Sequence, residues 1–252
     1  MNRLEWNHKY VLSRNPLYLS FGKTNIFLQE MEGTIRVYNT FNEGLEKEDS
    51  ESIAYQSFAF VEKVNSIICK PDFPMYPFVI KFNSALRLKK GAKLKLFLNL
   101  PPFCKILTTN QQESKLCEIP DRQMSHTWFG NEQKGELCYW LPSNIAFQEH
   151  EVEVGHEILC ELDIFIEEIQ NSDEVILERV KLETTNIEIY EKDGKLRSSK
   201  VLITYSQGVD FKQNYNYSIS KPDIQGYSLL TTARSSRGKW DISKLNEFIK
   251  VI

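Results

Sequence analysis

Apolar and polar residues alternate with a period of two over much of the chain. The clearest run has apolar residues or histidine at even positions (Val152, Val154, His156, Ile158, Cys160, Leu162, Ile164 and Ile166) and acids at most odd ones (Glu151, Glu153, Glu157, Glu161, Asp163 and Glu167). Successive side chains of a strand point to opposite faces, so this run predicts an apolar face inward and an acidic face in water. Gly155 predicts a bulge or bend, so a short strand can precede a longer one.

Similar short runs recur along the chain: PLYLSF, TNIFLQ, TIRVYNTF, FVIKFN, KLKLFLNL, ELCYWL, VILERVKLET, NIEIY and KVLITY. Turn signals at Glu32-Gly33, Lys90-Gly91 and Asp193-Gly194 separate several of them, and the last predicts a hairpin. No helical periodicity intervenes, so the pattern predicts an all-β protein built as an antiparallel β-sandwich. The expected exception is a short C-terminal α-helix at 241–252, capped by Asp241.

The polar stretch at 108–126 is the best place for a domain boundary, because it separates a basic segment from the acidic-faced strands. We therefore expect an N-terminal β subdomain at 1–122 and a C-terminal β subdomain at 123–240, followed by the helix at 241–252. A single β domain over 1–252 also fits the pattern.

Composition and charge limit the class of protein. The 252 residues are 41% hydrophobic and 26% charged, as in ordinary globular proteins. The net charge of -3 supplies no field that attracts nucleic acid, so a nucleic-acid partner is not expected without a local basic patch. The N-terminus lacks a signal-peptide pattern, and no apolar run is long enough to span a membrane. We expect a soluble, cytoplasmic protein without membrane insertion, whose partner is another protein or a second copy.

Neither a metal nor a cofactor is expected. The chain has no glycine-rich phosphate loop and no G-x-G-x-x-G fingerprint. The five cysteines are scattered without a two-residue spacing and predict reduced, buried thiols. In HEVEVGHE, His150 and His156 are six residues apart, whereas a metalloprotease needs histidines four apart on a helix. A shared strand face would still allow a metal pair; the alternative is a surface His150 and a core or bulge-adjacent His156.

Catalytic side chains are few and ambiguous. Cys138 with His126 could form a nucleophile and base, but only if the fold brings them within hydrogen-bond distance; otherwise Cys138 is a structural thiol. Glu136, Glu151 and Glu153 could act as paired acids beside aromatic sugar platforms, as in glycoside hydrolysis. A regular row of strand carboxylates is also typical of a solvated sheet face.

The segment VIKFNSALRLKKGAKLKLFL carries the opposite charge, with Arg87, Lys89, Lys93 and Lys95 around a Lys-Gly turn. This basic hairpin could bind phosphate or an acidic partner, including the acidic strands of another copy. Lysines on exposed strands also prevent edge-to-edge aggregation.

The run HTWFGNEQKGELCYW at 126–140 predicts a hairpin with glycines in its turn. Its second strand has apolar groups on both faces, which predicts an interior strand. His126, Trp128, Glu136 and Trp140 form a candidate ligand or partner surface, because tryptophan near loops stacks on ligands or anchors interfaces.

The same run, with the alternating strands at 153–196, resembles an uncharacterised prokaryotic, mainly archaeal family, domain-of-unknown-function family 432. The resemblance is carried by the aromatic-x-Gly turn at Trp128-Phe129-Gly130, by Gly135, by the Leu-Cys-x-Trp strand at 137–140, and by Tyr190 before a hairpin. KPDFPMYP, FVIKF, the Lys-Gly turn and LFLNLPP follow the family's upstream order. It covers roughly 65–210 and implies an all-β soluble protein with no established catalytic residues. At Tyr139 the family often has a basic residue.

The residues favour a non-catalytic binding or assembly module. This hypothesis is based on the missing enzyme motifs, the charged strand faces and the aromatic loops. The alternative is a carbohydrate-active or other hydrolytic enzyme that uses Glu136, Glu151 or Glu153 beside Trp128 and Trp140.

Overall fold

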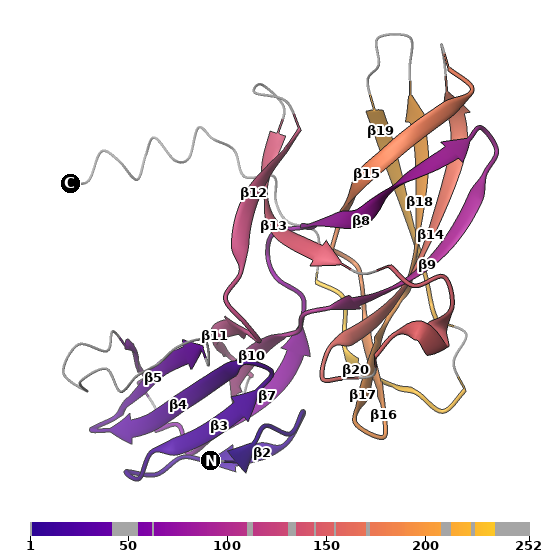
Figure 1. The fold of residues 1–252 in the computed structure, drawn as a ribbon. Helices are drawn as coiled ribbons and strands as arrows, with labels where there is room; N and C mark the ends of the chain where they lie inside the picture. The colour runs from indigo at the N-terminus through magenta and orange to yellow at the C-terminus, as the bar shows by residue number, and fades with distance from the viewer. Residues whose placement is uncertain are drawn as a thin grey trace, which may run out of the picture.

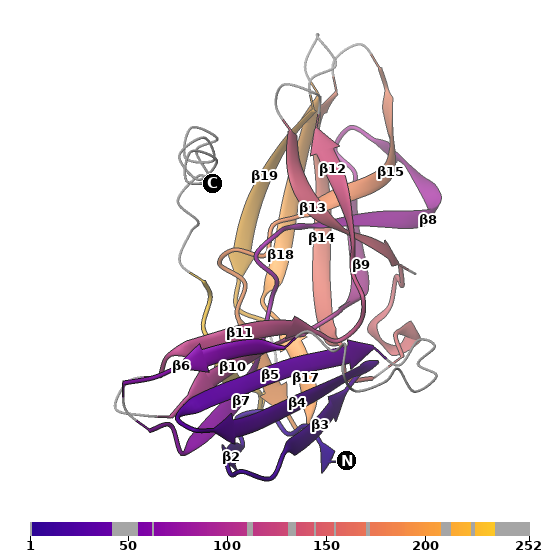
Figure 2. The same ribbon diagram turned by 90° about the vertical axis from the view of Figure 1, so that its left-hand side faces the viewer.

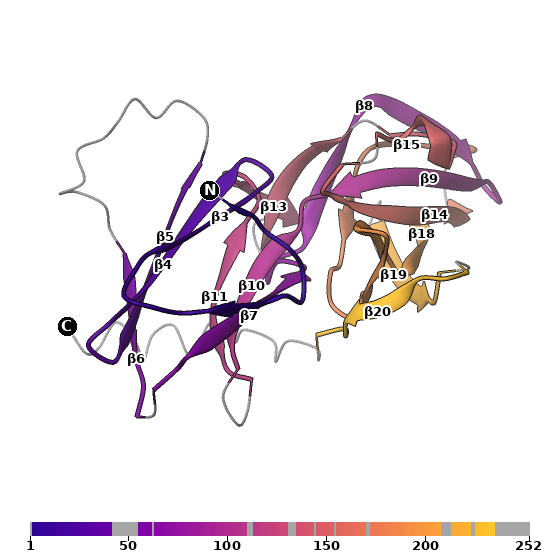
Figure 3. The same ribbon diagram turned by 90° about the horizontal axis from the view of Figure 1, so that it is seen from below.

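The chain folds into two β bodies, shown one above the other in Figure 1 and side by side in Figure 3. The computed structural model describes residues 2–41, 55–61, 63–109, 113–130, 135–143, 145–153, 155–169, 172–207, 213–222 and 225–234. Apart from one short 3-10 helix, the regular elements of these residues are strands, which confirms the all-β prediction. The helix expected at 241–252 lies outside the described residues.

The first body is a sandwich of two sheets. One sheet has the order β1 (Asn2–Arg3), β3 (Leu17–Phe21), β4 (Thr24–Met31), β5 (Thr34–Phe41) and β6 (Gln56–Ala59). The other has the order β11 (Lys115–Pro120), β10 (Phe103–Thr108), β7 (Ser66–Asp72) and β2 (Lys9–Val11). Figure 2 looks onto the first of these sheets, with the second behind it.

In the first body, buried and partly exposed side chains alternate along strands such as β4, which explains how the two sheets enclose a core. On β4, Ile26 and Leu28 are buried and their neighbours Asn25 and Phe27 are not, as expected of a strand with one face on a core. The β4–β5 turn at Glu32-Gly33 has positive φ at both residues, 51° and 80°, which matches the right-handed twist of a two-residue hairpin.

The second body contains a four-stranded and a seven-stranded sheet. The first has the order β12 (Ser125–Gly130), β13 (Gly135–Ser143), β8 (Phe78–Lys89) and β15 (Glu174–Leu182). The second has the order β19 (Gln213–Ser220), β18 (Lys200–Gln207), β14 (Ile158–Ile169), β17 (Lys195–Ser198), β16 (Ile189–Lys192) and β20 (Ser228–Thr231), with β9 (Lys93–Leu100) also on β14. β13 lies between β12 and β8, so the prediction of an interior strand is confirmed.

Each body has its own core. The first core includes Leu19, Ile26 and Ile106, and the second includes Phe78, Leu98 and Ile164. β8 and β9 pack in the second core although they precede residue 122. The chain therefore passes between the bodies after β7, after β9 and after β11, and the boundary at residue 122 stays a prediction.

Two details differ from the sequence prediction. Four strand pairs in the described chain are parallel: β1 with β3, β13 with β8, and β14 with both β17 and β18. The alternating run from residue 151 is not strand at its start, because Glu149–Glu151 form a 3-10 helix and β14 begins at Ile158. The Glu151 carboxylate accepts hydrogen bonds from the backbone N–H groups of Phe147 (3.0 Å) and Gln148 (3.1 Å), which stabilises this helix start.

Candidate functional site

The segment between the 3-10 helix and β14 lies where the two bodies meet. It is fixed on one side by the amide of Asn99, which donates to the carbonyl of Glu153 at 2.9 Å. On the other side it places His156 and Glu157 against the end of β11. Two cavities lined by described residues flank this segment.

The junction is tied together by a buried carboxylate. The Asp121 side chain is fully buried, with its Oδ2 2.7 Å from His156 Nε2. Arg122 donates to both carboxylate oxygens of its neighbour, at 2.9 and 2.6 Å, and also contacts Glu157. A buried charge needs such partners, because an unpaired one is strongly destabilising. Burial acts to lower the pKa of Arg122, but hydrogen bonds and charges from Asp121 and Glu157 raise it above its ordinary value.

Gly22 makes this contact sterically accessible. It has a φ of 54°, and a Cβ at this position would lie 2.6 Å from His156 Nε2. The next residue is joined to the same loop, because the N–H of Lys23 donates to the carbonyl of Asp121 at 2.8 Å. Glycine at residue 22 therefore serves both the turn and the approach of the imidazole.

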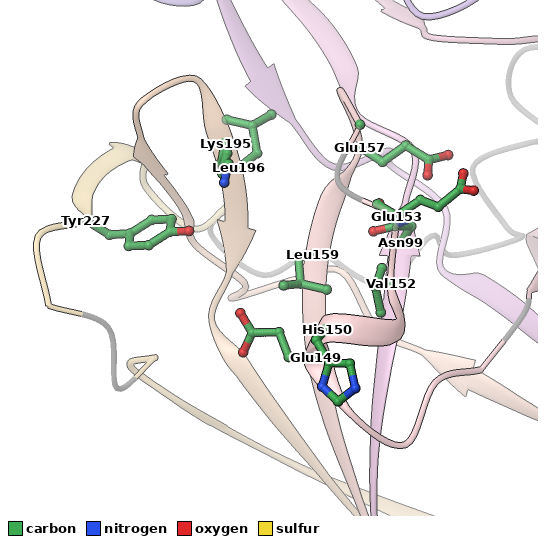
Figure 4. Close-up of a pocket in the computed structure, with 11 residues that line it drawn as sticks. Asn99, Glu149, His150, Val152, Glu153, Glu157, Leu159, Lys195, Leu196 and Tyr227 are labelled. Carbon is green, nitrogen blue, oxygen red and sulfur yellow. The ribbon is translucent and has the colours of Figure 1, made fainter.

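The smaller cavity, of 440 Å³, lies between the 3-10 helix and the β16–β17 hairpin (Figure 4). Leu159 and Leu196 supply apolar surface, and Tyr227 and Lys195 come from the hairpin side. Glu149, His150, Glu153 and Glu157 contribute polar side chains from the helix and the segment after it. In Figure 4 the carboxylates of Glu153 and Glu157 point in one direction, away from Tyr227.

The larger cavity, of 1140 Å³, has walls from both bodies. Its apolar surface includes Trp6 and Phe21, whose rings meet edge to face with centroids 5.8 Å apart, and Leu229. Its ionisable groups include Arg3, Glu5, His156, Glu191 and Asp193. Gly155 and Glu157 line the smaller cavity, whereas His156, which lies between them in the sequence, lines the larger one.

The acidic face of β14 is covered by cations of the same chain. Glu161 is 2.7 Å from the ammonium of Lys95 on β9 and 3.0 Å from that of Lys200 on β18. The buried guanidinium of Arg197 is 3.4 Å from Glu161 and 2.6 Å from Glu149 at the smaller cavity. Burial acts to raise the pKa of Glu161, but the hydrogen bonds from Lys95 and Lys200 lower it. The expectation of an acidic face in water was therefore wrong for Glu161 and Asp163, because the neighbouring strands supply lysines, whereas Glu167 is exposed as expected.

The predicted basic hairpin is partly neutralised within the chain. Arg87 pairs with Glu174 on β15 at 3.1 Å, and Lys95 pairs with Glu161. Lys93 lies over the ring of Phe165, and Lys89 stands opposite Glu174 in the β8–β15 register. The sequence analysis considered the acidic strands of a second copy as a partner of this hairpin. In the structure, Arg87 and Lys95 instead pair with acidic strands of the same chain.

The predicted surface residues lie on the β12–β13 hairpin. The side chain of His126 contacts the rings of Tyr139 and Tyr76, with centroids 4.7 and 5.9 Å away. Trp128 is 50% exposed, and its indole lies against Gly135, where an added Cβ would be 2.1 Å from Nε1. Trp128 therefore faces neither a core nor the two junction cavities. The ligand or partner surface expected at His126, Trp128, Glu136 and Trp140 stays a prediction.

The other two members lie on the opposite face of the hairpin. Glu136 pairs with Lys181, and Trp140 lies under the ammonium of Lys81. The three acids of the hydrolase hypothesis are thus dispersed: Glu136 is on β13, Glu151 caps its own helix, and Glu153 lines the smaller cavity.

The two other sequence hypotheses do not match the geometry. Cys138 stands opposite Thr127 and His126 opposite Tyr139, so the thiol and the imidazole are on opposite faces of the sheet. His150 is exposed on the 3-10 helix, and His156 is held by Asp121. In the part of the chain that the structure describes, no group of three or more histidine, cysteine or acidic side chains could hold a metal ion.

The cysteines are free and buried, as predicted. Burial raises the pKa of Cys117 to about 12 and that of Cys160 to about 11. Such thiols carry little thiolate at neutral pH and are poor nucleophiles. No helix among the residues described is long and apolar enough to span a bilayer.

Sequence reasoning missed the residues of the junction. Asp121 and Arg122 follow a strand in an ordinary polar stretch, and His156 is 35 positions further along the chain. The available signals were Gly22 after a strand and the histidine beside Gly155. Neither identifies the partner across the junction.

The model of one protein family matches residues 6–248, nearly the whole chain; the family is described as a protein of unknown function (DUF432). This region is longer than the 65–210 on which the resemblance rested. Neither a curated protein nor a solved structure matches the chain.

Proposed function

Since the chain belongs to the family described as a protein of unknown function (DUF432), we propose a function from the junction of its two bodies: it is a non-catalytic binding protein. Its ligand occupies the two junction cavities and carries both positive charge and apolar groups. A basic segment of another protein has this chemistry.

The main support for this proposal is the excess of carboxylates around the cavities. Among the residues that the structure describes, six acids line them (Glu5, Glu149, Glu153, Glu157, Glu191 and Asp193), against two permanent cations, Arg3 and Lys195. Arg197 and Arg122 offset Glu149 and Glu157, and the remaining acids still outnumber the cations. A cleft lined by one sign of charge raises the local concentration of ligands of the opposite sign.

The apolar wall supports the same class of ligand. Trp6, Phe21 and Leu229 lie in the larger cavity, and Leu159 and Leu196 in the smaller one. Binding sites combine such surface with a few polar groups that fix orientation. A purely polar polyamine would leave this surface exposed, whereas a peptide with alternating lysine and leucine would cover it.

The test is fluorescence anisotropy with a labelled peptide, Lys-Leu-Lys-Leu-Lys, and its charge-reversed counterpart Glu-Leu-Glu-Leu-Glu. We expect the lysine peptide alone to bind, and the combination of Asp193→Asn with Glu153→Gln to weaken its binding about tenfold, as expected for about 1.4 kcal/mol. Glu178→Gln removes an exposed acid outside both cavities and should change nothing. Equal binding of the two peptides, or unchanged binding in the double variant, would reject the proposal.

A hydrolytic enzyme is the second candidate, favoured by the pairing of His156 with the buried Asp121 at the wall of the larger cavity. A histidine oriented by a carboxylate is the usual arrangement of a general base. Its test is hydrolysis of p-nitrophenyl acetate, which His156→Gln should abolish. Hydrolysis that is equal in the variant would remove this candidate.

A further inference from the structure

The outer face of the β12–β13–β8–β15 sheet carries cations that the junction does not use. Arg179 on β15 stands directly opposite Lys81 on β8 in the antiparallel register. Side chains in this position are about 5 Å apart at Cβ, and like charges there repel each other. The fold therefore holds two positive charges together at a cost in stability.

Neither cation has a carboxylate partner among the described ion pairs. The ammonium of Lys81 lies 5.8 Å from the centroid of the Trp140 ring, and the guanidinium of Arg179 lies 5.5 Å from that of Phe129. Lys181, two residues further along β15, differs from them because it contacts Glu136 and is 2.5 Å from Glu183. On this face, acidic side chains therefore pair with Lys181, whereas Lys81 and Arg179 lie over aromatic rings.

The cations lie in the angle between the hairpin and the sheet. Phe129 and Glu136 belong to the β12–β13 hairpin, yet they contact Arg179 and Lys181 on β15, which is separated from β13 by β8. The hairpin therefore leans over the β8–β15 pair. Trp140 and Phe129 border the same angle, so cationic and aromatic side chains alternate around it.

We propose that this face binds a single-stranded nucleic acid, with Lys81 and Arg179 holding one or two of its phosphates and the bases lying beside Trp140 and Phe129. Phosphate oxygens relieve the repulsion of the opposed cations, and an arginine fork fits phosphate well. Sheet faces that combine cations with aromatic rings bind single strands through phosphate contact and base stacking. An acidic peptide would match the charge and leave the rings unused.

The overall charge of -3 does not oppose this site at moderate salt. Beyond about one Debye length, roughly 8–10 Å in physiological salt, exposed charges are screened and the local pair dominates. The binding should therefore be weak and local, with a modest dependence on salt.

The test is anisotropy of fluorescein-labelled dT12 between 50 and 200 mM KCl, a range in which each phosphate contact contributes about -0.7 to the slope of log K against log salt. We expect a slope near -1.4 for the wild-type protein, and Lys81→Gln and Arg179→Gln should each reduce its size by about 0.7. Lys9→Gln, on exposed β2 of the other body, should leave it unchanged. A 12-base-pair duplex should bind more weakly because its bases are stacked inside.

Three results would overturn the proposal: no binding of dT12 at 50 mM KCl, unchanged slopes in both variants, or displacement of dT12 by decaglutamate at equal charge concentration. The last result would identify a carboxylate-binding face. Loss of fold is checked by thermal unfolding. Removal of either opposed cation should not lower the midpoint, because it removes a repulsion.

Discussion

Gly22 offers the sharpest test of the junction. In Gly22→Ala the new methyl group would lie 2.6 Å from His156 Nε2 and 3.0 Å from the backbone oxygen of Asp121. Backbone surrounds it on one side, so the imidazole must move. The hydrogen bond between His156 and Asp121 is then lost, and among the described side chains the buried carboxylate keeps only Arg122 as a partner.

The magnitude has two parts. An alanine in the left-handed region costs roughly 1–2 kcal/mol, and a lost hydrogen bond to a charged group costs about 1.5–3 kcal/mol. Gly33→Ala supplies the matched control. It has a φ of 80°, and nothing lies within 4 Å of its added Cβ, so only the first part applies.

Urea unfolding followed by circular dichroism and tryptophan fluorescence measures both variants. We expect Gly22→Ala to lower the free energy of unfolding by about 1.5–3 kcal/mol more than Gly33→Ala does. In a double-mutant cycle, His156→Ala should remove most of this excess, because the 2.6 Å contact disappears and only the contacts with Asp121 at 3.0 Å remain. Equal losses in the two glycine variants would refute the close approach of His156 to Gly22.

Three further predictions follow from the charged and thiol groups. Asp121→Asn should destabilise the protein by about 1.5–3 kcal/mol in thermal unfolding, because Arg122 and His156 lose the charged acceptor of their hydrogen bonds while Arg122 keeps Glu157; a loss below 1 kcal/mol, the range of an exposed pair, would contradict it. The pKa of Glu161 is lower in the folded state than in the unfolded state, so its contribution is fully present above the unfolded value near pH 4.3 and is lost as pH falls through the folded value. Glu161→Gln should therefore flatten the stability profile below about pH 4.3, with an unchanged profile as the contrary result. The five buried cysteines should not react with a thiol reagent at pH 8 until the protein unfolds in urea; prompt reaction of Cys160 in the folded protein would count against its burial.

The alternating pattern predicted the strands because burial of one sheet face determines it directly. β14 shows this, with Ile158, Leu162 and Ile164 buried in sequence-predicted positions. The strand start at residue 151 was wrong because Glu151 caps a short helix instead. A local hydrogen bond from the backbone to a side chain can favour a short helix over a strand, even where apolar and polar residues alternate.

Long-range pairing was not readable from the sequence. The register of β9 against β14 places Lys95 opposite Asp163 and beside Glu161, and this determines whether the acidic face meets water or lysine. The parallel pairing of β14 with β18 could not be predicted either, because the local sequence of a strand does not specify which strand lies beside it. The junction residues Asp121 and His156 come from different bodies, and their contact depends on the whole fold.

The passage of the chain between the bodies has a consequence for synthesis. When β7 to β9 leave the ribosome, β9 lacks its partner β14, which begins 58 positions after the end of β9, at Ile158. At 5–20 residues per second this delay is roughly 3–12 s. During that time Leu96, Leu98 and Leu100 have no sheet to cover them, while the first body waits for β10 and β11. Until β11 is complete at Pro120, the nascent protein therefore carries two unfinished cores at once, and the second core stays unfinished until β14 is made.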